Sequence, residues 1–435
     1  MRLAPPAPAA LAITCLLGAA SAHGAESKRI DAIYPSVEQL YMDLHQNPEI
    51  AFQEQRTAAT LAKRVEALGY EVTAGVGKTG IVAIMKNGDG PTVMLRTELD
   101  ALPMEEKTGL PFASHATTKN DAGETVPVAH MCGHDIHMAA WAGTAELMAQ
   151  NREHWHGTLM LVGQPAEETV AGARAMLQDG LFTRFPKPDY ALGVHDEHTL
   201  PAGVVGYHAG WFRANSTGLE LTIHGKGGHG AFPQSAIDPI VIAARVVLGV
   251  QTVVSRENNP LDPAVITVGS IHGGSASNII PDQVKLQITV RSLDPAVQKR
   301  LIAGIERQAK AEAQAANAPN APELEVKSNT DAVYNDPELT QRYAAAIRAA
   351  LGADRVVEMP AQMGGEDFSQ FGLAGVRAVL LHVGAVDPKK LEESHKSGVP
   401  VPAVHSPLFA PEREPTIKAA MAAEVAVLED LMGGR

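Results

Sequence analysis

The segment His130–His137 places a thiol, three imidazoles and a carboxylate within eight residues. Cys132 and His134 lie two residues apart on a loop that we expect to lead into a helix, so both side chains are able to reach one cation. The other cysteine, Cys15, lies in an N-terminal segment with the pattern of a signal peptide. Without that segment Cys132 has no disulfide partner, which favours a metal-bound thiolate over an unprotected thiol in an oxidising compartment. A buried thiol beside polar histidines is the alternative interpretation.

Three other places supply further candidate ligands. Glu167 and Glu168 directly follow a predicted buried strand, where one carboxylate can bind a metal ion while the other takes a proton from water. Capping of a following helix is the alternative explanation for the two acids. His195 follows another apolar run and His405 lies in a loop near the C-terminus, although histidines in such places are usually structural or surface residues. Together these residues supply the donors and the base that a hydrolytic metal site requires.

Asp135 and His137 are close enough to Cys132 and His134 to support them from behind. The other histidines, His45 among them, need no role, because they are numerous enough that some must be surface or packing residues. His382 is the strongest competitor of His405 as a ligand, because it lies within a predicted strand.

The elements around these candidates alternate between helix and strand patterns. Apolar residues every three or four positions predict helices, and short apolar runs bounded by turns predict buried strands. This alternation predicts an α/β fold with a sheet covered by helices on both faces. The turn 87–90 is expected to join the first two strands. The predicted helices are 35–46, 56–68, 138–148, 338–351 and 414–431, and the predicted strands are 81–85, 92–95, 158–162, 190–194 and 378–383.

The section from about Arg213 to Asp331 has the order β-α-β-β-α-β, which is typical of a ferredoxin-like α+β unit with its helices on one face. We therefore predict a catalytic domain in two parts, 26–212 and 332–435, with an inserted domain at 213–331. The inserted strands are predicted at 219–224, 265–271, 284–290 and 324–326, and its helices at 239–254 and 295–316.

Length and charge narrow the class of protein. The 435 residues are enough for two domains, and the net charge of -13 argues against a nucleic-acid partner. A basic residue, an apolar run from 7 to 20 and small residues at 20–22 predict a signal peptide at 1–22. We therefore expect an exported protein, periplasmic or secreted, with no membrane partner after cleavage. An uncleaved membrane anchor is the alternative.

Six motifs occur in order along the chain: RTELDALP at 96–103, HMCGHD at 130–135, QPAEE at 164–168, GGHGA at 227–231, GGSASNIIPD at 273–282 and GGEDF at 364–368. From about Tyr34 to the C-terminus the chain resembles metallopeptidase family M20, in particular its amidohydrolase branch. That branch contains hippurate hydrolases, N-acyl-amino-acid amidohydrolases and plant auxin-conjugate hydrolases. One position departs from the pattern, because Glu98 stands where the branch usually has aspartate.

The resemblance implies a centre of two divalent metal ions per subunit. Zinc suits a mixture of thiolate, imidazole and carboxylate donors, and manganese, cobalt and nickel are alternatives. Cys132 would bridge the two ions. The complete set of implied ligands is Cys132, His134, Glu168, His195 and His405.

The resemblance also implies roles for residues beside the metals. Glu167 would be the general base, and Asp100 would orient the ligands from behind. His229, in the inserted domain, would stabilise the developing oxyanion, in the active site of the partner subunit of a homodimer. Asn278 and Arg291 would hold the free carboxylate of the substrate.

These implications predict an exported metal-dependent amidohydrolase that uses a metal-activated water to cleave N-acyl-amino acids or related conjugates. A dipeptidase or carboxypeptidase with the same centre is the alternative, so the substrate is a small N-acyl-amino acid or a short peptide. A periplasmic metal- or ligand-binding protein without turnover is a third hypothesis. The pair Glu167 and Glu168 argues against it, because binding alone needs no base.

Overall fold

The computed structural model describes residues 11–120 and 122–433, with side chains of the first helix described from Glu26 onward. The chain divides into two compact units. The large unit comprises Met1–Gly210, Asn335–Met359 and Gln370–Arg435, and the small unit comprises Trp211–Tyr334 and Pro360–Ser369. Each unit has a hydrophobic core of its own.

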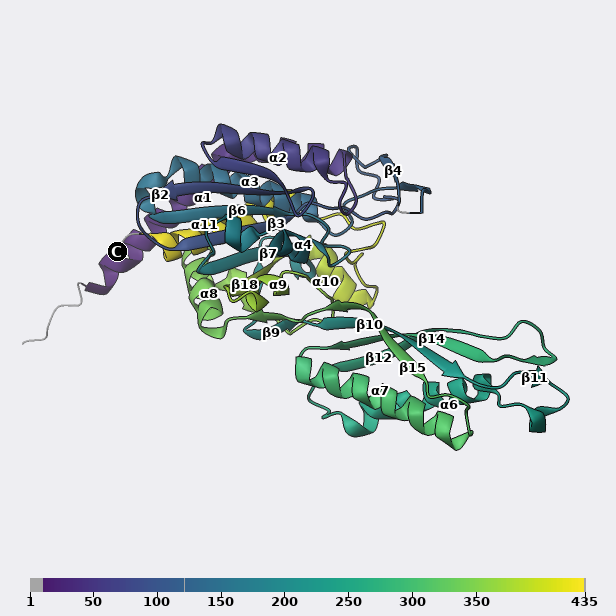
Figure 1. Ribbon diagram of the computed structural model, residues 1–435. Coiled ribbons are helices and arrows are strands. Elements are labelled where there is room, and N and C mark those ends of the chain that lie inside the picture. The colour runs from purple at the N-terminus through teal and green to yellow at the C-terminus, as the bar shows by residue number, and fades with distance from the viewer. Residues whose placement is uncertain (1–10, 121, 434–435) are drawn as a thin grey trace, which may run out of the picture. The chain divides into compact units, whose positions relative to one another are not determined.

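The large unit is built on a mixed sheet of eight strands in the order β1-β2-β6-β3-β7-β18-β8-β17 (Figure 1). The neighbours β6, β3, β7 and β18 run parallel, so their carboxyl ends lie along one edge of the sheet. The strands are β1 Glu71–Val76, β2 Gly80–Asn87, β3 Thr92–Glu98, β6 Gly157–Gln164, β7 Tyr190–Pro201, β8 Val205–Tyr207, β17 Val356–Glu358 and β18 Arg377–Val386.

Both faces of this sheet are covered, as the sequence predicts. Leu159 and Leu161 of β6 belong to the main core, while Met160 and Val162, which point to the other face, are also fully buried. The helices α3 and α11 pack on β3 and β7, and α4 contacts β6. The helices of the large unit are α1 Leu11–Gln46, α2 Gln55–Ala67, α3 His134–Gln150, α4 Gly172–Gln178, α5 Leu181–Arg184, α8 Pro337–Leu351, α9 Ser369–Leu373, α10 Pro388–Ser397 and α11 Arg413–Met432.

The start of the first helix differs from the prediction. The apolar face of residues 37–44 predicts a helix that starts at Pro35, but α1 begins at Leu11 and contains Pro35. Ile30, Ile33 and Tyr34 are buried in the same core as the residues after the proline. Their burial offsets the backbone hydrogen bond that proline cannot make. Part of the predicted signal peptide, residues 1–10, lies outside the described residues.

The turn at 87–90 connects β2 to β3, as predicted, and β6 lies between these two strands in the sheet. The strand before His195 is longer than predicted. β7 continues to Pro201 rather than ending at Val194, so His195 lies within the strand. The parallel partner β18 extends alongside it, which supplies backbone hydrogen bonds for the additional residues.

The small unit is the ferredoxin-like unit expected from the sequence. Its antiparallel sheet has the order β12-β14-β10-β15, and α6 and α7 lie side by side on one face (Figure 1). Residues of β14 alternate between buried and exposed, which leaves the opposite face of the sheet in solvent. The elements are β10 Asn215–His224, α6 Pro239–Thr252, β12 Ala264–His272, β14 Gln283–Ser292, α7 Pro295–Ala315 and β15 Glu323–Thr330.

Within the described residues, one helical stretch, Pro239–Glu257, is long and apolar enough to cross a membrane by length and composition. It is α6 with the turn that follows, and its buried residues pack against the sheet of the small unit. A single stretch of this kind is weak evidence for a membrane span, because a helix that packs on a protein core passes the same test.

Candidate metal centre

The parallel strands bring the candidate ligands of the large unit together. β3 leads into Asp100, β6 leads into Glu167 and Glu168, and β7 contains His195, all at the same edge of the sheet. Open parallel sheets form their sites at this edge, because the loops after neighbouring strands meet there. His134 is the first residue of α3.

Two groups of donor atoms meet at Cys132. Donor set 1 consists of Cys132, His134 and His195, and donor set 2 consists of Cys132, Glu168 and His405, with the donor atoms of each set within 4.8 Å of one another. The sulfur of Cys132 lies 3.6 Å from Nε2 of His195 and 3.3 Å from Nε2 of His405. Nε2 of His405 lies 3.3 Å from Oε2 of Glu168. Since both sets contain the same sulfur, a bridging thiolate fits the geometry.

The histidine rings are oriented for coordination. Nδ1 of His134 lies 2.8 Å from the carbonyl oxygen of Asp100, and Nδ1 of His195 lies 2.8 Å from that of Asp196. A carbonyl oxygen only accepts, so Nδ1 carries the proton in both rings and the lone pair of Nε2 faces the donor sets. Nε2 of His134 and Oε1 of Glu168 are buried without a hydrogen-bond partner among the described residues. Buried polar atoms are rarely left unpaired, and two metal ions would satisfy both of these.

The protonation of the donors couples metal binding to pH. Burial, reinforced by the carboxylate of Glu168, raises the pKa of the Cys132 thiol well above its ordinary value. Burial alone would raise the pKa of Glu168, but its hydrogen bond with His405 and the charge of His134 lower it. The thiol must therefore lose its proton when a cation binds, and metal affinity should rise with pH.

Glu167 lies beside the donor sets on a tightly held loop. Its Oε2 is 3.8 Å from Nε2 of His134, and the residue is only 7% exposed. Oε1 of Glu54 accepts a hydrogen bond from the backbone N–H of Ala166, and Asp100 accepts one from Glu168. Ala166 has a φ of 52°, an unfavourable conformation for alanine that these contacts stabilise. Asp100 thus lies behind the ligands. The sequence did not reveal the supporting role of Glu54.

Gly133 allows the two ligands on either side of it to approach β7. It has a φ of 75°, and a Cβ atom there would lie 2.5 Å from Oδ2 of Asp196. Only glycine fits this close approach.

A buried ionic cluster supports the start of α3. Nδ1 of His45 lies 2.6 Å from Oδ2 of Asp135, and Nε2 lies 3.1 Å from Oε2 of Glu106. Burial alone would lower the pKa of His45, but hydrogen bonds with the two carboxylates raise it to about 10. Burial likewise opposes ionisation of Glu106, yet its bond with His45 lowers the pKa of Glu106 to about 2. His45, to which the sequence assigns no role, therefore lies between two buried carboxylates.

Replacing His45 with glutamine should destabilise the metal-free protein by about 3 kcal/mol, because it leaves two buried carboxylates without their cation. The folded pKa of about 10 lies above the ordinary histidine pKa of about 6.5, so the stabilisation is complete below pH 6.5 and is lost as the pH rises toward 10. Urea unfolding at pH 6.5 and pH 9.5 should therefore show a smaller pH dependence in the variant than in the wild type. The control is His154→Gln, an exposed histidine. Equal pH dependence in wild type and His45→Gln would contradict this role.

The other candidate residues lie in the small unit. His229 is in β11 (Gly228–His229), which pairs with β13 (Ile279–Ile280), so His229 and Asn278 are close in space. Arg291 lies near the far end of β14, where it donates to the carbonyl oxygen of Met363. Gln283, at the end of β14 nearer Asn278, lies eight positions before Arg291. At about 3.4 Å per residue, these eight positions span about 27 Å.

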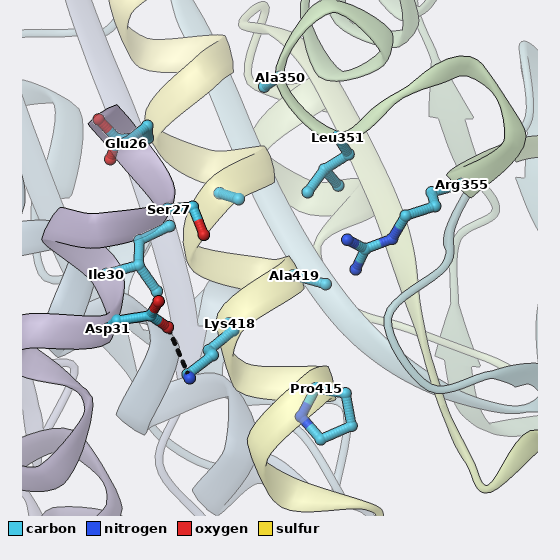
Figure 2. Close-up of a pocket in the computed structure, with 11 residues that line it drawn as sticks. Glu26, Ser27, Ile30, Asp31, Ala350, Leu351, Arg355, Pro415, Lys418 and Ala419 are labelled. Carbon is cyan, nitrogen blue, oxygen red and sulfur yellow. Dashed lines mark hydrogen bonds and ion pairs between the residues drawn. The ribbon is translucent and has the colours of Figure 1, made fainter. Parts of the chain in front are cut away.

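Figure 2 shows a pocket of the large unit that is lined by residues of α1, α11 and the end of α8. Its volume is about 190 Å³. Lys418 points across it to Asp31, with 2.7 Å between Nζ and Oδ1. Its described lining contains neither histidine nor cysteine, so this cavity is not the metal centre.

Comparison with known proteins identifies the family. The model of Peptidase family M20/M25/M40 matches residues 94–404. The chain belongs to this family. It is 36% identical over 334 residues to an N-acetyl-L-cysteine deacetylase of Bacillus subtilis, covering 75% of each chain. It is 35% identical over 341 residues to thermostable carboxypeptidase 2 of Saccharolobus solfataricus, covering 77% of this chain and 82% of that one.

Among solved structures, a dinuclear metal-binding peptidase of the M20 family from Bacillus subtilis matches with a TM-score of 0.75 and 29% identity, covering 91% of this chain and 98% of that one. This M20 chain is therefore a metal-dependent hydrolase that acts on amide bonds. Donor sets 1 and 2 are among the groups of described residues that could hold a metal ion, and they are the two that share the sulfur of Cys132 with His195 and with His405.

Proposed function

We propose that this M20 hydrolase is an exported amidohydrolase that cleaves the amide bond of N-acyl-amino acids, with two divalent ions held by donor sets 1 and 2. When bound, such ions polarise the substrate carbonyl and lower the pKa of water. The observation that carries the proposal is the buried carboxylate of Glu167 beside two donor sets that share Cys132.

The residues of the chain would divide the chemistry between them. Glu167 is close enough to the donor sets to take a proton from the attacking water, and the same carboxyl can then return it to the leaving amine. Oδ2 of Asp100 accepts a hydrogen bond from the backbone N–H of Glu168, which holds the loop of Glu168 in place. His229 would donate to the oxyanion, an interaction worth about 2.7–4 kcal/mol in comparable sites.

The test is a hydrolysis screen on metal-reconstituted protein. N-acetyl-amino acids, aromatic N-acyl-amino acids and dipeptides are compared at equal concentration, with amino-acid release as the measurement. We expect N-acyl-amino acids to be the better substrates, chelation to abolish turnover and divalent metal to restore it. Turnover that survives complete removal of metal would contradict the proposal.

A peptidase is the second candidate, because a carboxypeptidase is among the relatives at 35% identity. Both activities require the same centre, so the difference lies in the pocket that receives the acyl group. Faster release from dipeptides than from N-acyl-amino acids in the same screen would favour the peptidase.

We propose zinc as the native metal, with manganese, cobalt and nickel as alternatives. One thiolate, three imidazoles and one carboxylate form a donor set of intermediate softness, which supports zinc. Metal analysis of protein purified from its natural source would decide among them.

We also propose export after cleavage near residue 22. The support is the basic start, the apolar run and the small residues at 20–22. The N-terminal sequence of protein recovered outside the cytoplasm tests it, and a mature protein that begins at Met1 would contradict it.

A homodimer is proposed through the small unit. The edge strand β12 has no Lys, Arg, Asp or Glu and exposes Val265 and Ile271, whereas the other edge, β15, carries charges that discourage pairing. Arg291 lies about 27 Å along β14 from the end of the strand that is nearer Asn278, so the two residues hold one small carboxylate only if they come from two copies of the chain. The molar mass in solution tests this, and a monomeric active enzyme would contradict it.

A further inference from the structure

Glu98 is the last residue of β3. Its side chain is fully buried and contacts two basic groups. One carboxylate oxygen accepts a hydrogen bond from Arg96, and the other lies 2.9 Å from Nδ1 of His137. Because unpaired buried charges are costly, such a carboxylate holds both partners in a defined arrangement.

From His137 the contacts continue to a metal ligand. Nε2 of His137 lies 2.8 Å from the backbone nitrogen of Asp196 and 3.2 Å from its Oδ1. Asp196 directly follows His195, and its carbonyl oxygen accepts the hydrogen bond from Nδ1 of that ring. The backbone that orients His195 is therefore itself held by His137.

On the other side, Arg96 connects Glu98 to the strand that leads to the base. Nε of Arg96 donates to Oε1 of Gln164 over 2.9 Å, and Gln164 is the last residue of β6. The result is a buried polar ladder, Gln164–Arg96–Glu98–His137–Asp196, that crosses from β6 through β3 and α3 to β7.

We propose that Glu98 is a positioning residue for donor set 1, and that the length of glutamate allows one carboxylate to hold Arg96 and His137 at once. The proposal rests on the two-metal centre proposed above. Aspartate would withdraw both oxygens by one C–C bond, about 1.5 Å. The contact with His137 would then lengthen from 2.9 Å to about 4 Å, beyond hydrogen-bonding range, unless the strand or helix moved.

The test measures zinc affinity in variants that retain one donor set. His405→Ala removes a ligand of donor set 2, and His195→Ala removes a ligand of donor set 1. Adding Glu98→Asp to His405→Ala should weaken the remaining zinc affinity about 10–100-fold, the usual effect of losing support behind a ligand. Adding it to His195→Ala should leave the affinity unchanged. Competition with a chromophoric chelator gives both values without any measurement of turnover.

Glu424→Gln is the matched control. Glu424 is almost as buried as Glu98 and accepts a hydrogen bond from Thr144. Burial raises the pKa of its carboxyl to about 8, so glutamine reproduces its neutral form. This variant should leave both affinities unchanged. If Glu98→Asp does not fold, His137→Gln interrupts the same ladder and should give the same selective loss.

Two results would overturn the role of Glu98: an unchanged affinity of donor set 1, or an equal loss in both donor sets. Wild-type protein that binds fewer than two zinc ions would instead contradict the two-metal centre. The two failures are therefore distinguishable.

Discussion

Replacing Glu167 with glutamine is expected to lower kcat by about two to four orders of magnitude while both metal ions remain bound. The carboxylate lies next to the donor sets but belongs to neither donor set 1 nor donor set 2, so its loss removes a proton acceptor and no member of those sets. Glutamine has almost the same shape and cannot take a proton. The measurements are kcat on the best substrate of the screen and the metal content after gel filtration.

Glu168→Gln provides the contrasting control, because it changes the adjacent carboxylate, which belongs to donor set 2. It should lose metal from that set, and activity should partly return at high metal concentration. Glu167→Gln should not respond to added metal. A Glu167→Gln enzyme with wild-type kcat would contradict the assignment of the base.

The sequence predicted the elements whose patterns are local. The alternation in β14 follows directly from residues on opposite faces of a strand, and the strand that ends before Glu167 is a continuous apolar run between buried faces. The start of α1 could not be predicted in this way, because Pro35 is a local signal for a helix start. The burial of Ile30 and Tyr34, which overrides that signal, depends on tertiary packing.

The ligands were accessible from sequence through motifs that lie directly after predicted strands. Their supporting residues were not, because the contacts join distant parts of the chain. His45 lies 90 residues from Asp135, and Glu54 lies 112 residues from Ala166. Nothing in the sequence near His45 distinguishes it from an exposed histidine such as His154. Only the folded chain shows that it is enclosed by two carboxylates.

Replacing Cys132 with serine should lower the affinity for both metal ions, by more than about 100-fold each. The loss of a residue that only supports a ligand already lowers metal affinity about 10–100-fold. The sulfur is the one donor atom that donor set 1 and donor set 2 have in common. A thiolate carries a full negative charge between two cations, whereas a serine hydroxyl stays protonated far more readily and is a harder, weaker donor for zinc. The measurement is zinc stoichiometry and affinity by competition with a chelator.

Single-set variants make this prediction specific. His195→Ala and His405→Ala each remove a ligand of one donor set, so each should lower the affinity for mainly one of the two metal ions. If Cys132→Ser loses only one ion, the thiolate is a terminal ligand, and the bridging arrangement is wrong even though the ligand assignment survives. If it loses both ions while the fold stays intact by circular dichroism, the result requires a shared donor, because no other change to a single side chain in these two sets removes a ligand from each.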